Sequence, residues 1–327
     1  MPQDARGLLV DNPQASSTSP RTRDVLAAAL GEEIKLDVVA TAARGHAIEL
    51  AAQARADGLD VVVALGGDGT VNEVANGLLA AGVPDPRAAG QPGGEVPSLA
   101  VVPGGCTNVF ARTVGYPLGA VEATGQILEA LRAGRRREIG VGAARADGSP
   151  ARHFVFAAGL GLDAEVVARV ERARAAGKRA TGPLYARTAV RYMLGGGAER
   201  RRPPLQLLLP GEEPRNVFTT LITNADPWTY LLDRPVRPTP DASYDTGLDV
   251  FALARARALP TLRTALSMYG EHGAPRGRRV LVRHDLAALS VRSVSEEPLA
   301  FQVDGDHLGE HVELRLRSVP RALRVVV

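Results

Sequence analysis

The first part of the chain alternates between short apolar runs and stretches in which apolar residues recur with helical spacing. The apolar runs have the length of strands and lie in the segments RGLLVDNP, IKLDVVAT, VVVALGG and PSLAVVPGG. Helical spacing is found in TRDVLAAALG, from His46 to Ala56, from Thr70 onward and in GAVEATGQILEALRAG. Strands that alternate with helices in this way predict a parallel sheet covered by helices.

After about residue 138 the pattern changes to a series of strand-like segments, interrupted by helical spacing near 163–176, 183–194 and 258–270. A series of strands of this kind predicts a second domain built on antiparallel sheet. We therefore place one α/β domain at residues 1–138 and a β-rich domain at residues 139–327. The final segment, PRALRVVV, reads as one more strand that returns to either domain.

The composition is that of a soluble globular protein, with 327 residues, 45% hydrophobic and 23% charged. A net charge of +3 and an aromatic content of 4% argue against nucleic acid as a partner. A single cysteine, Cys106, suits a reducing compartment. The sequence contains neither a secretory signal pattern nor an apolar stretch long enough to span a membrane, so we expect a cytoplasmic location.

A glycine-rich turn follows the apolar run at 61–65, in the segment VVVALGGDGTVNEVANGLL. Thr70 and Glu73 fit a capping box, which predicts a helix whose free N–H groups form a site for an anion. The alternative is that Gly66, Gly67 and Gly69 only permit positive φ. Asp68 favours the anion site with Mg²⁺, because a carboxylate beside a phosphate needs a cation or a hydroxyl between them.

A second loop, VVPGGCTNVFAR, repeats this arrangement with Gly104 and Gly105 followed by Thr107 and Asn108. Loops at the carboxyl ends of parallel strands converge where α/β sheets bind ligands, so we expect the two loops to meet. In the segment DNPQASS, residues Asn12, Ser16 and Ser17 offer donors to a phosphate, or Pro13 simply nucleates a turn.

Two further segments carry acidic residues at turns. In AAGLGLDAEVV, the G-x-G-x-x-A spacing is a weak dinucleotide fingerprint that we reject, and Asp163 is either a helix cap or part of a metal or polar network. In FQVDGDHLGE, Asp304 and Gly305 predict a hairpin. The alternative is a functional turn, because Asp304 and Asp306 would repel each other without a cation or a proton to abstract.

Taken in order along the chain, the Asn12-Pro13 turn, the GGDGT and GGCTN loops and the DGD turn make the protein resemble the diacylglycerol kinase catalytic family. The resemblance implies a Rossmann-like sheet in the first domain, a mainly antiparallel β-sandwich in the second, and ATP bound between them. The ATP-binding residues that it implies are Asn12, Thr41, Gly66, Gly67, Asp68, Gly69, Thr70, Gly105, Thr107 and Asn108.

The resemblance also implies catalytic acids and metal ligands. Asp304 corresponds to the general base and Asp306 to the last acid of the same motif, while Asp163 and Asp245 correspond to an acidic Mg²⁺ network. The chain departs from the family pattern in having Thr246 where a second aspartate is common and Val109 where aspartate commonly follows the asparagine.

The expected activity is ATP-dependent phosphoryl transfer to a lipid hydroxyl, with diacylglycerol as the first candidate. The partner is then a lipid substrate at the inner face of the membrane, with the protein peripherally associated; whether it forms a homodimer is left open. Trp228 and Tyr230 line an apolar channel for this lipid or pack in the core, and the helix near 163–176 lies on the membrane or is a solvated amphipathic helix. The alternative functions are an NAD kinase-like enzyme and a catalytically silent nucleotide-binding regulator.

Overall fold

The computed structural model describes residues 5–15, 19–82, 96–146, 148–176, 182–194, 203–231 and 233–327. The chain forms two compact units: unit 1 comprises Met1–Gly140 and Pro320–Val327, and unit 2 comprises Val141–Val319. The division after residue 140 lies two positions from the sequence-based boundary at 138. The C-terminal segment, whose destination the sequence left open, returns to unit 1, where Val325 pairs with Leu99.

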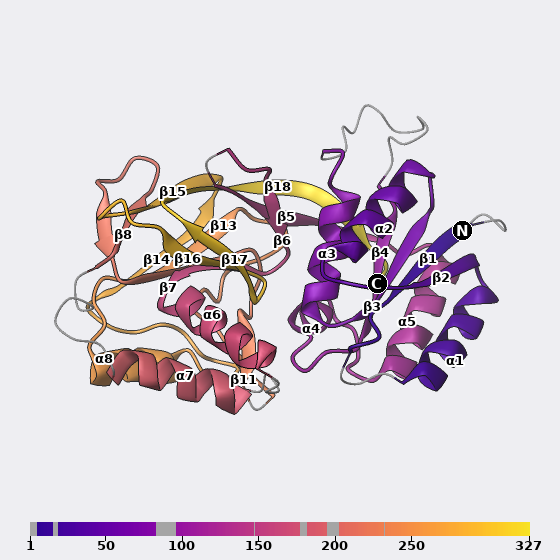
Figure 1. Ribbon diagram of the computed structural model, residues 1–327, viewed down its shortest axis with the longest axis horizontal. Helices are drawn as coiled ribbons and strands as arrows, with labels where there is room; N and C mark the ends of the chain where they lie inside the picture. The colour runs from indigo at the N-terminus through magenta and orange to yellow at the C-terminus, as the bar shows by residue number, and fades with distance from the viewer. Residues whose placement is uncertain are drawn as a thin grey trace. The chain divides into compact units, whose positions relative to one another are not determined.

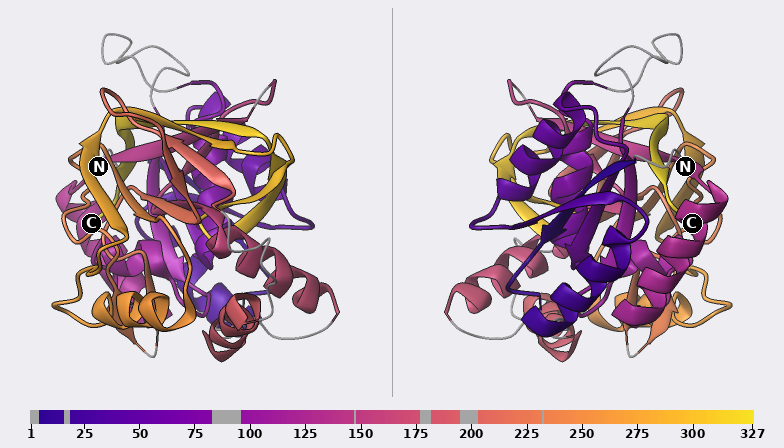
Figure 2. Two further views of the ribbon diagram at one scale, coloured as in Figure 1. Left: turned by 90° about the vertical axis from the view of Figure 1, so that its left-hand side faces the viewer. Right: turned by 90° about the vertical axis from the view of Figure 1, so that its right-hand side faces the viewer.

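Unit 1 is built on parallel strands in the order β2 (Lys35–Ala40), β1 (Arg6–Asp11), β3 (Val61–Gly66) and β4 (Ser98–Pro103) (Figure 1; Figure 2, right). Every residue of β3 and β4 is buried, which explains why these strands read as continuous apolar runs. β2 lies at the edge of the sheet and is largely exposed. The predicted parallel α/β domain is therefore confirmed.

Helices pack in pairs in unit 1 (Figure 1). Helix α2 (His46–Ala56) packs on α3 (Asp68–Leu78), and α1 (Pro20–Gly31) packs on α5 (Ala120–Ala133). The first pair is very close, because a Cβ placed on Gly77 of α3 would lie 2.2 Å from the carbonyl oxygen of Ile48. A short helix, α4 (Val109–Thr113), follows the second glycine loop.

Unit 2 is a β-sandwich. One sheet is antiparallel and runs in the order β14 (Val280–Leu286), β13 (Leu248–Leu253), β10 (Thr219–Thr223), β7 (Ala157–Gly161), β16 (Leu299–Val303) and β17 (Asp306–His311). The other layer contains β5 (Arg137–Ala146), β6 (Arg152–Phe154), β8 (Leu205–Leu208), β9 (Arg215–Val217), β15 (Ala288–Ser293) and β18 (Glu313–Val325).

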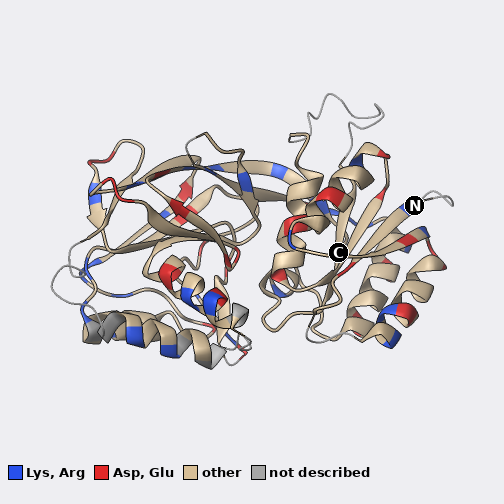
Figure 3. Cartoon of the chain, viewed as in Figure 1, with Lys and Arg blue, Asp and Glu red and all other residues tan. Residues whose placement is uncertain are grey.

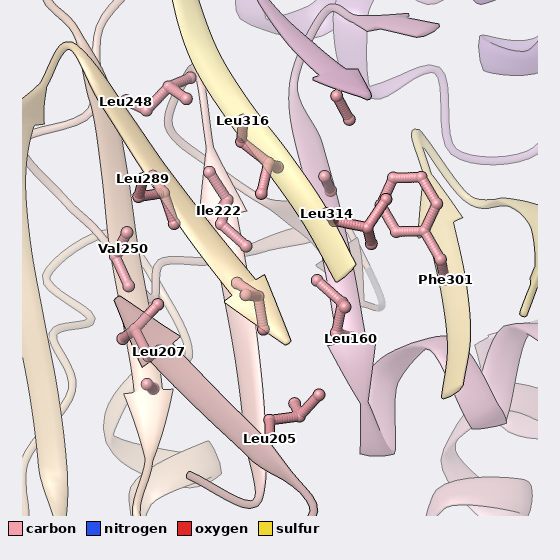
Figure 4. Packing of buried hydrophobic residues seen from close by; sticks show 14 of the residues in the cluster. Leu160, Leu205, Leu207, Ile222, Leu248, Val250, Leu289, Phe301, Leu314 and Leu316 are labelled. Carbon is pink, nitrogen blue, oxygen red and sulfur yellow. The ribbon is translucent and has the colours of Figure 1, made fainter. Parts of the chain in front are cut away.

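The core of unit 2 lies between these two layers, as Figure 4 shows. Leu160, Ile222 and Val250 of the first sheet pack with Leu289 and Leu316 of the second. The predicted antiparallel β-sandwich is confirmed by this shared core.

A second, smaller cluster covers the opposite face of the antiparallel sheet. Trp228 packs against this cluster, which contains Leu221 and Phe251, and it directly precedes β11 (Thr229–Leu231), which pairs with β12 (Arg234–Val236). Core packing, one of the two interpretations of Trp228, therefore accounts for this side chain.

Three helices complete unit 2: α6 (Leu162–Ala175), α7 (Gly182–Leu194) and α8 (Ala258–Ser267). Val166, Val167 and Val170 of α6 are buried, and the helix packs on β7 and β16. These valines face the sheet, so the interpretation of α6 as a membrane-surface helix is wrong. Within the described ranges, none of the helices combines the length and the apolar character needed to cross a bilayer.

His153 on β6 makes a prediction about acid stability. Its side chain is buried, and burial together with the charges of Arg317 and Arg152 lowers its pKa to about 4. Because the unfolded chain binds the proton near pH 6.5, stability is lost as the pH falls from about 6.5 to 4, by about 3 kcal/mol in total. We expect His153→Gln to remove this slope from urea unfolding measured across that pH range.

The matched control is His272→Gln, which changes an exposed histidine. This control should leave the pH dependence of the unfolding free energy as it is in the parent protein. Equal slopes for the parent protein and His153→Gln would contradict the assignment.

Candidate active site

The first glycine loop joins β3 to α3, but the helix begins earlier than the sequence predicted. Helix α3 starts at Asp68, with Gly67 as its N-cap and, among the described residues, no side chain that caps it. The hydroxyl of Thr70 accepts a hydrogen bond from Asn12 Nδ2 at 3.0 Å, and Glu73 Oε1 accepts one from the Gly45 N–H at 2.9 Å. The predicted capping box is therefore wrong, because both of its side chains are used elsewhere. A helix N-terminus without a side-chain cap is suited to bind an anion.

The second glycine loop, which follows β4, is closed by Asn108. The Asn108 side chain accepts a hydrogen bond from the Gly105 N–H and donates one to the Gly105 carbonyl, both at 2.8 Å. Asn108 is buried and left-handed, with φ of 49°, a conformation that asparagine tolerates better than most residues. Its amide group therefore shapes the loop.

The glycines of the two loops pack against each other. A Cβ on Gly105 would lie 2.7 Å from Gly67 Cα, and a Cβ on Gly104 would lie 3.0 Å from Gly66 Cα. The Gly104 N–H also donates to the Gly66 carbonyl at 2.8 Å. The expected convergence of the loops is confirmed. The alternative, that Gly66, Gly67 and Gly69 permit positive φ, is wrong, since none of the three has positive φ.

Asp68, in the first glycine loop, links the two loops by binding the start of α4, which follows the second loop. Its carboxylate accepts hydrogen bonds from the backbone N–H groups of Val109 and Phe110, each at 3.0 Å. The carboxylate thus caps α4, and its place beside a phosphate site does not require a metal ion. The position where the family commonly has aspartate, Val109, contributes only its backbone N–H to this contact.

The loops that follow β1 and β2 are held by hydrogen bonds at the same edge of the sheet. Asn12 Oδ1 accepts a hydrogen bond from the Gln14 N–H at 3.0 Å, so the predicted turn at Pro13 is confirmed. The Thr41 N–H donates to the Asp11 carbonyl at 2.7 Å, which brings the end of β2 beside the end of β1. The two serines predicted as phosphate donors, Ser16 and Ser17, lie outside the described residues.

In unit 2, Asp304 and Gly305 form the predicted hairpin turn between β16 and β17, with φ of 47° and 83°. The Asp304 carboxylate is 4% exposed and accepts hydrogen bonds from three consecutive backbone N–H groups. These belong to Val155, Phe156 and Ala157, at 2.7, 3.0 and 2.9 Å. Three amide donors therefore stabilise this carboxylate, an arrangement that the sequence does not reveal.

Asp163 belongs to a polar network that reaches the same turn. Burial raises its pKa to about 6, although a hydrogen bond from Gln302 Nε2 at 2.6 Å favours the charged form. Gln302 Oε1 in turn accepts from the Gly305 N–H at 2.9 Å. A Cβ on Gly159 would lie 1.8 Å from Asp163 Oδ2, so the glycine of the rejected dinucleotide fingerprint makes room for this carboxyl group. Sequence reasoning missed Gln302, although it lies two residues before Asp304 in the segment FQVDGDHLGE.

The two acids predicted as magnesium ligands do not fit a metal site. Asp245 is exposed in a turn that the Thr246 hydroxyl closes by donating to the Ser243 carbonyl at 3.1 Å. Within the described parts of the chain, no group of three or more His, Cys, Asp or Glu side chains could hold a metal ion. Neither Asp163 nor Asp245 therefore belongs to such a group among the described residues, and we assign no step of the reaction to a metal ion that the protein holds.

Comparison with known proteins identifies the first part of the chain. Residues 6–144 match the model of the diacylglycerol kinase catalytic domain. A protein of Citrobacter koseri named "Probable lipid kinase YegS-like" is 34% identical over 110 residues, which are 34% of this chain and 33% of that protein. The diacylglycerol kinase of Bacillus subtilis is 41% identical over 78 residues, which are 24% of this chain and 22% of that enzyme. The aligned part of the chain thus spans a third or less of the length of these relatives.

The fold has a solved counterpart over nearly its whole length. The crystal structure of a diacylglycerol kinase from Bacillus anthracis aligns with a TM-score of 0.68 and covers 98% of this chain and 96% of its own. At 19% identity this likeness shows the fold. The resemblance predicted from the motifs is confirmed over residues 6–144, which match the diacylglycerol kinase catalytic domain.

Proposed function

We propose that the protein is an ATP-dependent lipid kinase that transfers the γ-phosphate of ATP to a lipid hydroxyl, with diacylglycerol as the acceptor. The main support is the stacked pair of glycine loops at the carboxyl ends of β3 and β4, beside a helix N-terminus that lacks a side-chain cap. Amide groups that are fixed in place before the substrate binds stabilise phosphate charge without reorganisation. The family match of residues 6–144 supports the same activity.

In this proposal the phosphates of ATP bind at the backbone of residues 66–70 and 104–108. The side chains of Asn12, Asp68 and Asn108 hold the loops in position, since each is hydrogen-bonded within this framework. Thr41 and Thr107 line the same edge of the sheet. Catalysis then comes mainly from positioning and from electrostatic stabilisation of the transferred group.

We assign the role of general base to Asp306 instead of Asp304. Asp304 is buried and accepts three backbone N–H groups, so its oxygens are poorly placed to receive a substrate proton. Asp306, two residues later at the start of β17, is only partly buried. The lipid hydroxyl gives its proton to Asp306 while its oxygen attacks the γ-phosphorus, and the bond to the bridging oxygen breaks to release ADP.

A transfer assay with labelled γ-phosphate tests the proposal. The parent protein is incubated with Mg-ATP and, in separate reactions, with diacylglycerol, a sphingoid base or NAD. We expect label in diacylglycerol, and we expect Asp306→Asn to lower kcat by at least about a hundredfold with an unchanged KM for ATP. Label in NAD would instead identify an NAD kinase-like enzyme, and ATP binding without label in any acceptor would identify the regulator.

A further inference from the structure

Helix α8 has its apolar face on the outside. Leu259, Leu262 and Leu266 are 59%, 46% and 63% exposed, while Thr261 and Thr264 are buried. The spacing of the leucines places all three on one side of the helix. A surface helix normally has the opposite arrangement, with leucines against the core and threonines in water.

The buried side of α8 is fixed by specific polar contacts. The Thr264 hydroxyl donates to the Arg276 carbonyl at 3.1 Å, and the Arg276 N–H donates to Ser267 Oγ at 3.1 Å. Met268, directly after the helix, is buried in the smaller hydrophobic cluster of unit 2. These contacts hold the helix in its orientation, so the exposure of the leucines is built into the fold.

An arginine-rich pocket is formed by α8 and the segment 276–279; Thr261, Arg263 and Thr264 line it on the helix, and the exposed leucines do not. Its volume is about 280 Å³, and the charged residues that line it are Arg255, Arg263, Arg276, Arg278 and Arg279. Within the part of the chain that the structure describes, none of these five guanidinium groups forms an ion pair. Residues 254–282 contain a single acidic residue, Glu271. In the same unit, α7 carries Arg187 and Arg191 and no acidic residue (Figure 3).

We propose that the leucine face of α8 and the adjacent arginine pocket dock unit 2 on an anionic phospholipid bilayer. The leucines enter the boundary between headgroups and acyl chains, and the arginines bind lipid phosphates. The docking itself does not depend on catalysis. Its purpose rests on the proposed function, because a lipid kinase must meet its acceptor at a membrane.

Charge favours a bilayer over a second copy of this chain as the occupant of the surface. In a symmetric dimer the same patch from each copy would face itself, which would bring two clusters of arginines together. Like charges at such short distances repel each other, whereas an anionic membrane neutralises them.

Binding to vesicles in the absence of ATP tests the proposal. The first variant replaces Leu259, Leu262 and Leu266 by Gln, which keeps helix propensity while removing the apolar face. We expect its affinity for vesicles of mixed phosphatidylglycerol and phosphatidylcholine to fall at least about tenfold. The matched control replaces Val25 and Val121, exposed valines on helices of unit 1, by Gln, and this control should bind as the parent protein does.

A second variant, Arg276→Gln with Arg278→Gln, tests the pocket. We expect about a fivefold loss of vesicle affinity for each arginine, because a basic residue near an anionic surface contributes about that much. Binding of the parent protein to the mixed vesicles should weaken as salt rises, and binding to pure phosphatidylcholine should be much weaker.

Several results would overturn the proposal. These are unchanged vesicle affinity in the leucine variant, equal affinity of the parent protein for neutral and anionic vesicles, and a leucine variant that turns a dimer into a monomer without losing vesicle affinity. Failure of the kinase proposal would be seen separately, as a lack of phosphoryl transfer to a soluble short-chain diacylglycerol. On that soluble acceptor the leucine variant should be as active as the parent protein.

Discussion

We expect Asp304→Asn to lower the free energy of unfolding by about 2 to 4 kcal/mol, in addition to reducing turnover. In the folded protein Asp304 Oδ2 accepts a hydrogen bond from the Val155 N–H, and Oδ1 accepts from Phe156 and Ala157. An asparagine would present an NH₂ group to one of these donors and would leave at least one buried N–H without an acceptor. Urea unfolding at pH 7 measures the change.

Asp306→Asn is the matched control for this experiment. Asp306 is only partly buried at the start of β17, so we expect its amide variant to lose less stability than Asp304→Asn does. Both variants should lose turnover, because one removes the proposed base and the other disturbs the turn that positions it. An Asp304→Asn variant that is fully stable and yet inactive would show that Asp304 itself is the base, as the resemblance first implied.

Gly105→Ala is expected to weaken ATP binding by at least about tenfold and to destabilise the protein by about 1 to 3 kcal/mol. The added Cβ would lie 2.7 Å from Gly67 Cα and 3.0 Å from Asn108 Oδ1, so the two loops would have to separate. Their amide groups would then no longer match the spacing of the phosphates. Isothermal titration with ATP and thermal unfolding measure the two effects.

Gly125→Ala provides the control for added bulk at a glycine. Gly125 lies within α5, and a Cβ there would meet no atom within 4 Å. We expect this variant to bind ATP normally and to be as stable as the parent protein or slightly more stable, because alanine favours the helix. Normal ATP affinity in Gly105→Ala would show that the packing of the loops does not form the phosphate site.

The strands of unit 1 could be predicted because local sequence determines them. The segments at 61–65 and 99–102 are apolar throughout, and this is what a central parallel strand buried on both faces requires. The Asp304-Gly305 hairpin was predictable for the same reason, since both residues readily adopt positive φ. In these cases the residue type alone carries the information.

The contacts that shape the candidate site depend on partners far along the chain. Thr70 and Glu73 have the spacing of a capping box, but Asn12 and Gly45 bind their side chains instead. Asp68 suggested a metal ion because the backbone N–H donors on α4 that its carboxylate accepts from, about 40 residues away, could not be known. Tertiary hydrogen bonds overrode the local pattern in each case.

The exposed leucines of α8 also could not be predicted from the local sequence. The helical periodicity between 258 and 270 would place the leucines against the core, whereas in the structure they are exposed. The contacts of Thr264 and Ser267 with the segment around Arg276 decide this.

Hydrogen–deuterium exchange with and without ATP tests the central claim most directly, since the claim concerns particular backbone amides. We expect ATP to slow exchange in peptides that cover residues 66–72 and 104–110 and to leave α8 unchanged. Saturating ATP that protects neither loop, or that protects only segments of unit 2, would contradict the account.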